Sequence, residues 1–261
     1  MAVSSPNPFA INANVVLADG SRTRPDKPLL HEDFGEFKAT LRTLAALFPE
    51  REPSSVSIVD LGCLEGGYTF GFARAGYQCL GLEVREINYA KCEWIRERAG
   101  LDNVAFVRDD ARNLARYGTF DVVFCSGLLY HLDEPADFLE IMAQCTRRVL
   151  ILNTHYSTPN MDAETLQRLG LSDQVELNGT PGRYYKEYEL GTTREEMERV
   201  LWASWGNHRS FWMDRRHLLQ SLLDVGFDAV YEQFDFLENV AIDSYIEEQS
   251  RSMFMALKTA C

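Results

Sequence analysis

The stretch "VDLGCLEGGYTF", residues 59–70, has the residue types of a ligand-binding loop between a strand and a helix. Asp60 is followed by glycines at positions 62, 66 and 67. Free backbone N–H groups at such a helix start bind anionic or carboxylate-bearing ligands. A dinucleotide loop would need a glycine at position 64 as well, because pyrophosphate requires close backbone approach there. Leu64 therefore favours a nucleoside ligand without pyrophosphate.

A second chemical signal is Glu83, which lies 21 positions after Gly62, at the predicted end of the next strand. In nucleotide-binding α/β folds a carboxylate at this place accepts hydrogen bonds from the ribose diol. The loop and Glu83 together predict a nucleoside site.

The elements around these residues form a regular alternation. Strands are predicted over 56–61, 77–83, 103–107, 120–125 and 148–153, and helices over 67–75, 87–99 and 135–144, with a short helix after 103–107. Strands that are apolar throughout and alternate with helices form a parallel sheet covered on both faces. Right-handed crossovers make such a sheet doubly wound.

The flanking segments complete one predicted domain over residues 1–261. An extended arm with room for one short hairpin precedes an amphipathic helix over 31–48. After the fifth strand, turn residues and aromatics indicate an insertion that acts as a lid. The insertion is followed by a helix that is capped by Asp214 and ends before Gly226. Two strands, over 227–234 and 252–258, complete the sequence. The predicted parts are 1–49 (arm and helix), 50–154 (ligand-binding half), 155–213 (insertion) and 214–261 (last helix and strands).

Composition and net charge exclude several classes of partner and location. A hydrophobic content of 46% supports a full core, and a net charge of -13 argues against nucleic-acid or anionic-membrane partners. The sequence contains no apolar run of membrane-spanning length. Its six cysteines form no C-x-x-C pair, so we expect reduced core thiols. The start lacks an export-signal pattern, and we expect a cytoplasmic protein.

Five ordered segments resemble the motifs of class I S-adenosylmethionine-dependent methyltransferases. The segments are "VDLGCLEGG", "LGLEVRE", "VRDDARNL", "FDVVFCSGLLYHLDEPADFL" and "RRVLILNTH". The similarity covers roughly residues 50–155 and the terminal strands. It departs from the family at Leu64, where a glycine is usual. The resemblance implies a seven-stranded, mostly parallel Rossmann-like sheet, S-adenosylmethionine as cofactor and S-adenosylhomocysteine as product.

The resemblance also assigns the methionine and ribose contacts of that cofactor. Gly62, Cys63 and Gly66 would line its methionine part. Asp60 would order the loop or reach the cofactor amine, and Glu83 would hold both ribose hydroxyls.

The remaining cofactor residues follow the third and fourth strands. Asp110 and Ala111 stand where the family contacts adenine; Asp110 would accept from the exocyclic amine, and Asp109 could instead cap the next helix. Ser126 would lie beneath the sulfonium. Tyr130 would contact the methionine end or serve only as a packing residue.

Methylation of an oxygen would require a base for the hydroxyl proton. His155 follows the predicted fifth strand and His131 the fourth, so both belong to the carboxyl edge of the sheet, where ligands bind. His155 is the first choice because it opens the insertion, and His131 is the second. His208 is a weaker candidate, and each of these histidines could instead be structural. His155 with nearby carboxylates could hold Mg²⁺, although no ligand spacing in the sequence indicates a metal site.

The insertion should form the acceptor pocket. Its candidate substrate-binding residues are the aromatics Tyr184, Tyr185, Trp205 and Trp212. Such rings stack on sugar or aromatic acceptors, or else only pack the lid.

A narrower likeness concerns "GLLYHLDEP" and "WASWGNHRSFW". Together they resemble tRNA wobble-uridine carboxymethyltransferases and bacterial sugar O-methyltransferases of the mycobacterial methylmannose 1-O-methyltransferase type. We favour a methyltransferase that acts on a hydroxyl of a small acceptor, such as a saccharide in polysaccharide biosynthesis. A tRNA-modifying enzyme and a non-catalytic cofactor-binding module are the alternatives, and a monomer and a homodimer are equally compatible with the sequence.

The charge balance yields a first prediction. At physiological salt the protein should not shift tRNA or duplex DNA in a gel, because a net charge of -13 opposes a phosphate backbone. Micromolar tRNA binding that weakens as salt is raised would contradict the small-acceptor interpretation.

Overall fold

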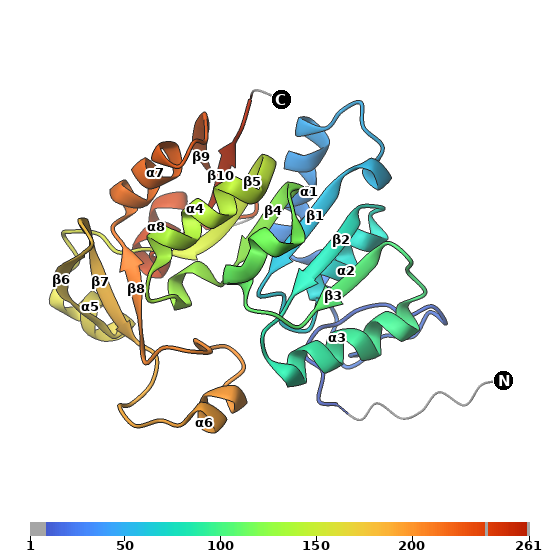
Figure 1. Cartoon of the computed structure of the whole chain (residues 1–261), viewed down its shortest axis with the longest axis horizontal. Helices are drawn as coiled ribbons and strands as arrows, with labels where there is room; N and C mark the ends of the chain where they lie inside the picture. Colours follow the sequence, from blue (N-terminus) through green and yellow to red (C-terminus); the bar gives the residue numbers. More distant parts are fainter. Residues whose placement is uncertain (1–8, 238–239, 260–261) are drawn as a thin grey trace.

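The computed structural model describes residues 9–237 and 240–259, and its centre is a seven-stranded sheet (Figure 1). The strands are β1 (Ser57–Leu61), β2 (Gln78–Leu82), β3 (Val104–Val107), β4 (Phe120–Ser126), β5 (Thr146–His155), β9 (Ala229–Gln233) and β10 (Arg251–Leu257). Their order is β3-β2-β1-β4-β5-β10-β9. Only β10 runs antiparallel to its neighbours β5 and β9. The predicted doubly wound, mostly parallel sheet is thereby confirmed.

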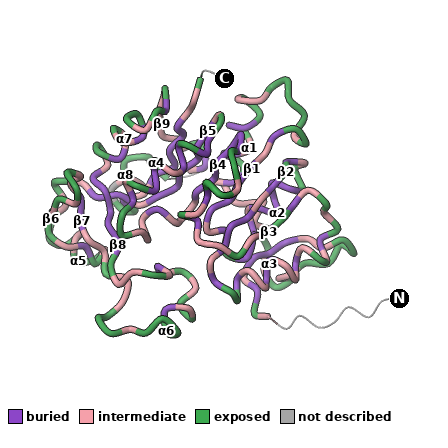
Figure 2. The backbone as a smooth tube through the Cα atoms, viewed as in Figure 1, coloured by how far each residue is buried: buried purple, intermediate pink, exposed green. Residues whose placement is uncertain are grey.

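Helices cover both faces of this sheet, as the apolar strands required. One face carries α1 (Gly35–Leu47), α2 (Gly67–Arg74), α3 (Glu86–Ala99) and α8 (Ile242–Gln249), and the other carries α4 (Pro135–Cys145) and α7 (Arg215–Asp224). Alternate residues of β4 serve the two cores: Val122 and Phe124 pack under the first set, and Val123 and Cys125 under the second. Figure 2 shows these central strands as the most buried part of the chain.

Several element boundaries differ from the sequence prediction. The helix expected over 31–48 is split, because Phe34 has an extended backbone (φ -66°, ψ 143°) between a 3-10 turn at His31–Asp33 and α1. The fifth strand extends to His155, since its end pairs with Arg251 of β10. Helix α8 was not predicted. Further 3-10 turns lie at Pro53–Ser55, Ala111–Tyr117 and Leu129–His131.

The predicted insertion contains a sheet of its own at one end of the molecule (Figure 1). Its elements are α5 (Ala163–Leu169), β6 (Leu171–Leu177), β7 (Thr180–Lys186), α6 (Arg194–Arg199) and β8 (Arg209–Met213), and the three strands are antiparallel. Asn178 and Gly179, both with positive φ, form the two-residue turn between β6 and β7. The backbone N–H of Phe211 donates to Leu132 O (2.9 Å), which ties β8 to the loop after β4.

Glu65 of the glycine loop fastens the N-terminal arm and also forms a buried ion pair with α3. Glu65 bonds Lys91 at 2.7 Å, and both side chains are almost fully buried. The other Glu65 oxygen accepts the backbone N–H of Ala13 (2.7 Å). A bridge between Val16 and Arg22 gives the arm the expected short hairpin.

Other expectations concern caps and thiols. The Asp214 side chain caps α7 by accepting the backbone N–H of Arg216 (3.0 Å), as predicted. Cysteines 63, 79, 92, 125 and 145 are buried and unpaired, whereas Cys261 lies outside the described residues. Within residues 9–237 and 240–259, no helix has the length and apolar character that crossing a membrane requires.

Candidate active site

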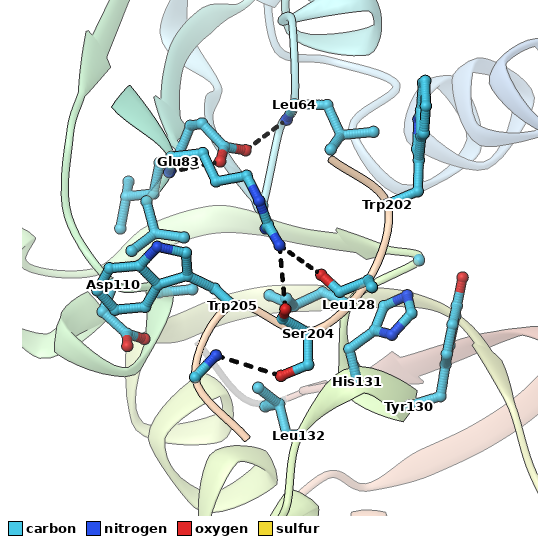
Figure 3. A pocket seen from close by; sticks show the side chains of 18 of the residues that line it. Leu64, Glu83, Asp110, Leu128, Tyr130, His131, Leu132, Trp202, Ser204 and Trp205 are labelled. Carbon is cyan, nitrogen blue, oxygen red and sulfur yellow. Dashed lines mark hydrogen bonds between the residues drawn. The ribbon is translucent and has the colours of Figure 1, made fainter. Parts of the chain in front are cut away.

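The glycine loop after β1 keeps its curvature although Leu64 replaces a glycine. Leu64 adopts φ 52°, in the left-handed region that favours glycine, as do Gly62 (φ 67°) and Gly66 (φ 75°). This conformation costs an L-residue about 1–2 kcal/mol. The Leu64 N–H donates to Glu83 Oε2 at 2.9 Å, and this bond helps to hold the loop in place (Figure 3).

Glu83 directly follows β2 and joins that strand to the loop. Its Oε1 accepts the backbone N–H of Arg85 (2.8 Å), and the residue is 2% exposed. Burial raises the pKa of the Glu83 carboxyl to about 7, although the N–H groups of Arg85 and Leu64 and the Arg85 charge oppose the shift. A carboxylate has about four acceptor positions. Glu83 therefore retains capacity for two hydroxyl donors.

A cavity of about 290 Å³ opens beside Glu83, at the carboxyl edge of the sheet. The loop, the ends of β2 and β4, the turn after β3 and residues 201–207 of the insertion line it (Figure 3). A second cavity of about 120 Å³ shares Gly62, Leu64, Tyr68 and Ser126 with the first, and His31 of the arm also lines it. The two cavities share these lining residues, so an elongated ligand could reach both.

The predicted cofactor residues fall into three groups. Those in the larger cavity are Gly62, Glu83, Asp110, Ala111, Ser126 and Tyr130. Asp60 and Cys63 line only the smaller one. Gly66 lines neither cavity in the described structure, which corrects its expected place: a Cβ atom there would lie 2.8 Å from Phe106, so the glycine serves packing.

Three acidic residues have defined partners. Asp60 is buried and accepts the Thr69 hydroxyl proton (2.6 Å), and burial raises its pKa to about 7. The cap of the 3-10 helix at Ala111–Tyr117 is Asp110, which also pairs with Arg112. Asp109, the residue weighed for that cap, instead accepts from the Tyr117 hydroxyl (2.7 Å) and from its neighbours.

His131 lies in the cavity wall with one ring nitrogen already occupied. Its Nδ1 is 2.8 Å from Glu187 Oε1, and the Glu187 side chain is 1% exposed. The other Glu187 oxygen accepts the backbone N–H of Ser204 (3.0 Å). A neutral imidazole that donates from Nδ1 to a carboxylate keeps a lone pair on Nε2. His131 thus has the arrangement of an oriented base.

His155 occupies a different environment from the one expected. It is the last residue of β5, stacks on Trp212 (ring centroids 4.6 Å apart) and places Nδ1 2.9 Å from Gln249 O. Burial and the Arg251 charge lower its pKa to about 4. In the described lining of both cavities His155 does not occur, and neither does His208. Of the two candidate bases, His131 thus lines a cavity and His155 does not.

Of the four aromatic residues expected to bind an acceptor, Trp205 lines the cavity. Tyr185 stacks on Trp212 (5.3 Å between centroids), and the Trp212 indole N–H donates to Tyr130 O (3.1 Å). Tyr184 meets Phe211 edge-on. Trp212 thus joins the small sheet to the main domain, whereas these ring contacts of Tyr184 and Tyr185 lie between β7 and β8.

Comparisons with known proteins agree with this geometry. Residues 58–150 match the family model described as a methyltransferase domain. A solved structure of the N-terminal domain of EvdMO1, determined in the presence of S-adenosylhomocysteine and D-fucose, superposes with a TM-score of 0.64 at 26% identity. That alignment covers 86% of this chain and 83% of the other.

Residues 58–150 are a methyltransferase domain.

Two curated proteins are similar to about a third of this chain. The ubiquinone biosynthesis O-methyltransferase of Methylococcus capsulatus is 37% identical over 91 residues, and the tRNA U34 carboxymethyltransferase of Cronobacter sakazakii is 32% identical over 85 residues. These segments are 34% and 32% of this chain, and they span only 37% and 26% of the two relatives.

The methyltransferase site includes residues that sequence reasoning missed. Glu187 lies in the insertion, 56 positions from His131, and no spacing rule connects the two. Trp202 lines both cavities and is 62% exposed. Arg85 could have been noticed as a charged residue in the "LEVRE" segment, two positions after Glu83. No group of three or more His, Cys, Asp or Glu side chains suited to a metal ion occurs in the described part of the chain.

Glu83 should make the free energy of unfolding depend on pH. Its folded-state pKa of about 7 exceeds its ordinary value of 4.5, so the folded protein favours the neutral acid. The stabilisation is complete below pH 4.5 and is lost as pH rises through about 7, by up to about 3 kcal/mol. Urea unfolding should show that the free energy of unfolding falls less between pH 5 and pH 8 for Glu83→Gln than for the wild type. Equal declines would contradict a protonated Glu83.

Proposed function

We propose that the protein transfers a methyl group from S-adenosylmethionine to a hydroxyl of a small acceptor, favourably a saccharide. The observation that carries the proposal is the His131–Glu187 pair: His131 lines the same cavity as Glu83, and Glu187 bonds its Nδ1. One side of this cavity suits a nucleoside, and the other offers a base to a hydroxyl.

The residues present fit the cofactor. Glu83 has acceptor positions left for both ribose hydroxyls. Asp110 and Ala111 would contact adenine, while Gly62 and Asp60 lie toward the smaller cavity, where the methionine part would extend. The larger cavity of about 290 Å³ approaches the ordinary range of ligand sites, about 300–1,000 Å³. When bound, the cofactor supplies an electrophilic methyl group on its sulfonium.

His131 would remove the acceptor proton. Glu187 holds Nδ1 and fixes the ring orientation, so Nε2 can accept the proton of a hydroxyl in the cavity. The buried Glu187 carboxylate then stabilises the imidazolium that forms, as the carboxylate of a Ser-His-Asp triad does.

The cavity wall supports a sugar acceptor. Trp202 and Trp205 line it, and indole faces stack on the C–H surfaces of sugars. The EvdMO1 domain, with 26% identity, was solved in the presence of D-fucose. The acidic net charge agrees with a neutral small molecule better than with a polyanion.

A labelled-cofactor experiment tests this function. The protein is incubated with methyl-labelled S-adenosylmethionine and a panel of monosaccharides, and mass spectrometry follows label incorporation. We expect label on a sugar hydroxyl. Binding of S-adenosylhomocysteine without transfer to any hydroxyl compound would support a non-catalytic module instead.

The choice of base gives a further prediction. With the acceptor found in that panel, His131→Ala should reduce turnover by about 10²–10⁴-fold, the usual worth of general-base catalysis. Glu187→Gln should also be slow, because an amide N–H opposite Nδ1 favours the wrong tautomer. His155→Ala is the matched comparison and should retain far more activity. A larger loss in His155→Ala than in His131→Ala would reverse the assignment.

A further inference from the structure

The side chain of Arg85 connects the nucleoside end of the site with the insertion. It is 4% exposed, and its Nη2 donates to three backbone carbonyls: Ala203 O at 2.9 Å, Ser204 O at 3.0 Å and Met197 O at 3.3 Å. All three belong to residues 187–207, here called the lid segment. A buried guanidinium that satisfies several carbonyls fixes their positions, because charged donors form the stronger hydrogen bonds.

From Ser204 the contacts continue to the proposed base. The Ser204 carbonyl accepts from Arg85, and its N–H donates to Glu187 Oε2 (3.0 Å). Glu187 Oε1 in turn binds His131 Nδ1 (2.8 Å), and Asn207 Nδ2 donates to His131 O (3.1 Å). Figure 3 shows Ser204 and His131 on the same side of the cavity, below Glu83.

The position of the lid segment near Ser204 depends largely on side-chain contacts, because this part has no regular secondary structure. Between α6 and β8, residues 200–208 form only turns, bends and irregular backbone. Glu198 supplies one other attachment, since it accepts both the backbone N–H of Glu86 (3.0 Å) and the Trp205 indole N–H (2.7 Å). The hydroxyl of Tyr188 also donates to Ser204 O, but Tyr188 lies within the lid segment itself. Arg85 is thus a principal link from the lid segment to the strand that precedes Glu83.

We propose that Arg85 is a positioning residue for His131, acting through the lid segment and Glu187. The inference rests on the proposed function, in which His131 is the base. Without the guanidinium, the Ser204 N–H moves away from Glu187, and the carboxylate no longer holds the imidazole in one tautomer. The hydrogen bond from the backbone N–H of residue 85 to Glu83 remains in such a variant, because it does not use the side chain.

The chain offers a matched control in Arg183. It is also 4% exposed and also donates to three backbone carbonyls, those of Ser172, Thr158 and Pro159. All three lie in the insertion away from the cavity lining. Arg85→Met and Arg183→Met therefore each remove a buried guanidinium that donates to three carbonyls. Only the Arg85 guanidinium is linked to His131.

The test uses the full chain and three readouts. Nitrogen-15 NMR of the imidazoles, assigned with His131→Ala, should show Nδ1–H on His131 in the wild type and Arg183→Met but a tautomer mixture in Arg85→Met. Trypsin cleavage after Arg199 should be about tenfold faster in Arg85→Met only, since proteolysis reports local opening. Calorimetry should find S-adenosylhomocysteine affinity within about threefold of the wild type.

A double-mutant cycle separates positioning from general damage. Arg85→Met should lower turnover about tenfold in the wild type, as small displacements of a catalytic group do, and less than about twofold in His131→Ala. If Arg85→Met does not fold, Arg85→Lys, whose ammonium lacks the planar fork, replaces it in every assay.

Two results would overturn the inference. One is a wild-type His131 tautomer together with wild-type lid cleavage in the Arg85 variant. The other is an equal effect of Arg85→Met in both backgrounds of the cycle. Either result leaves the proposed function standing if the wild type binds S-adenosylhomocysteine and transfers label. A wild type that binds no S-adenosylhomocysteine overturns both.

Discussion

The buried carboxylate of Glu83 holds the glycine loop against the end of β2. It accepts the N–H groups of Leu64 and Arg85, so two separate backbone segments are fixed by one side chain. Burying a carboxyl group is costly unless hydrogen bonds satisfy it, and the raised pKa of about 7 reflects this cost. The hydrogen bond from the Leu64 N–H to Glu83 also helps to hold Leu64 in its left-handed conformation. The shape of the nucleoside end of the cavity follows from this contact.

The other end of the cavity depends on contacts between distant segments. His131 comes from the loop after β4, and Glu187 comes from the insertion. The small sheet is joined to that loop through Phe211 and Trp212, which bond the carbonyls of Leu132 and Tyr130. In the proposed function, the regular α/β part would supply the nucleoside site, and the insertion would supply the acceptor pocket and the partner of the base. This division explains how a common fold can serve a particular acceptor.

Local patterns were sufficient to predict the sheet, most helices and the place of Glu83 at the end of β2, because apolar periodicity and loop-to-carboxylate spacing lie within short stretches. Long-range pairing was not accessible in this way. The extension of β5 through His155 requires its pairing with β10, and that pairing removed His155 from the predicted loop. Glu187 gave no signal, because its role arises only when the insertion folds against His131. Tyr184 and Tyr185 had the right residue type for stacking, but type alone does not tell a pocket wall from a packing contact.

The central claim is that Glu83 and the glycine loop bind the nucleoside part of the cofactor. Isothermal titration of S-adenosylhomocysteine into the wild type and Glu83→Ala tests it most directly. We predict measurable binding to the wild type and a loss of about 1–3 kcal/mol in the variant, because two ribose hydroxyls lose their hydrogen-bond acceptor. Glu93→Ala, which removes a partly exposed carboxylate from α3, is the control and should bind as the wild type does. Unchanged affinity in a folded Glu83→Ala variant would contradict the account.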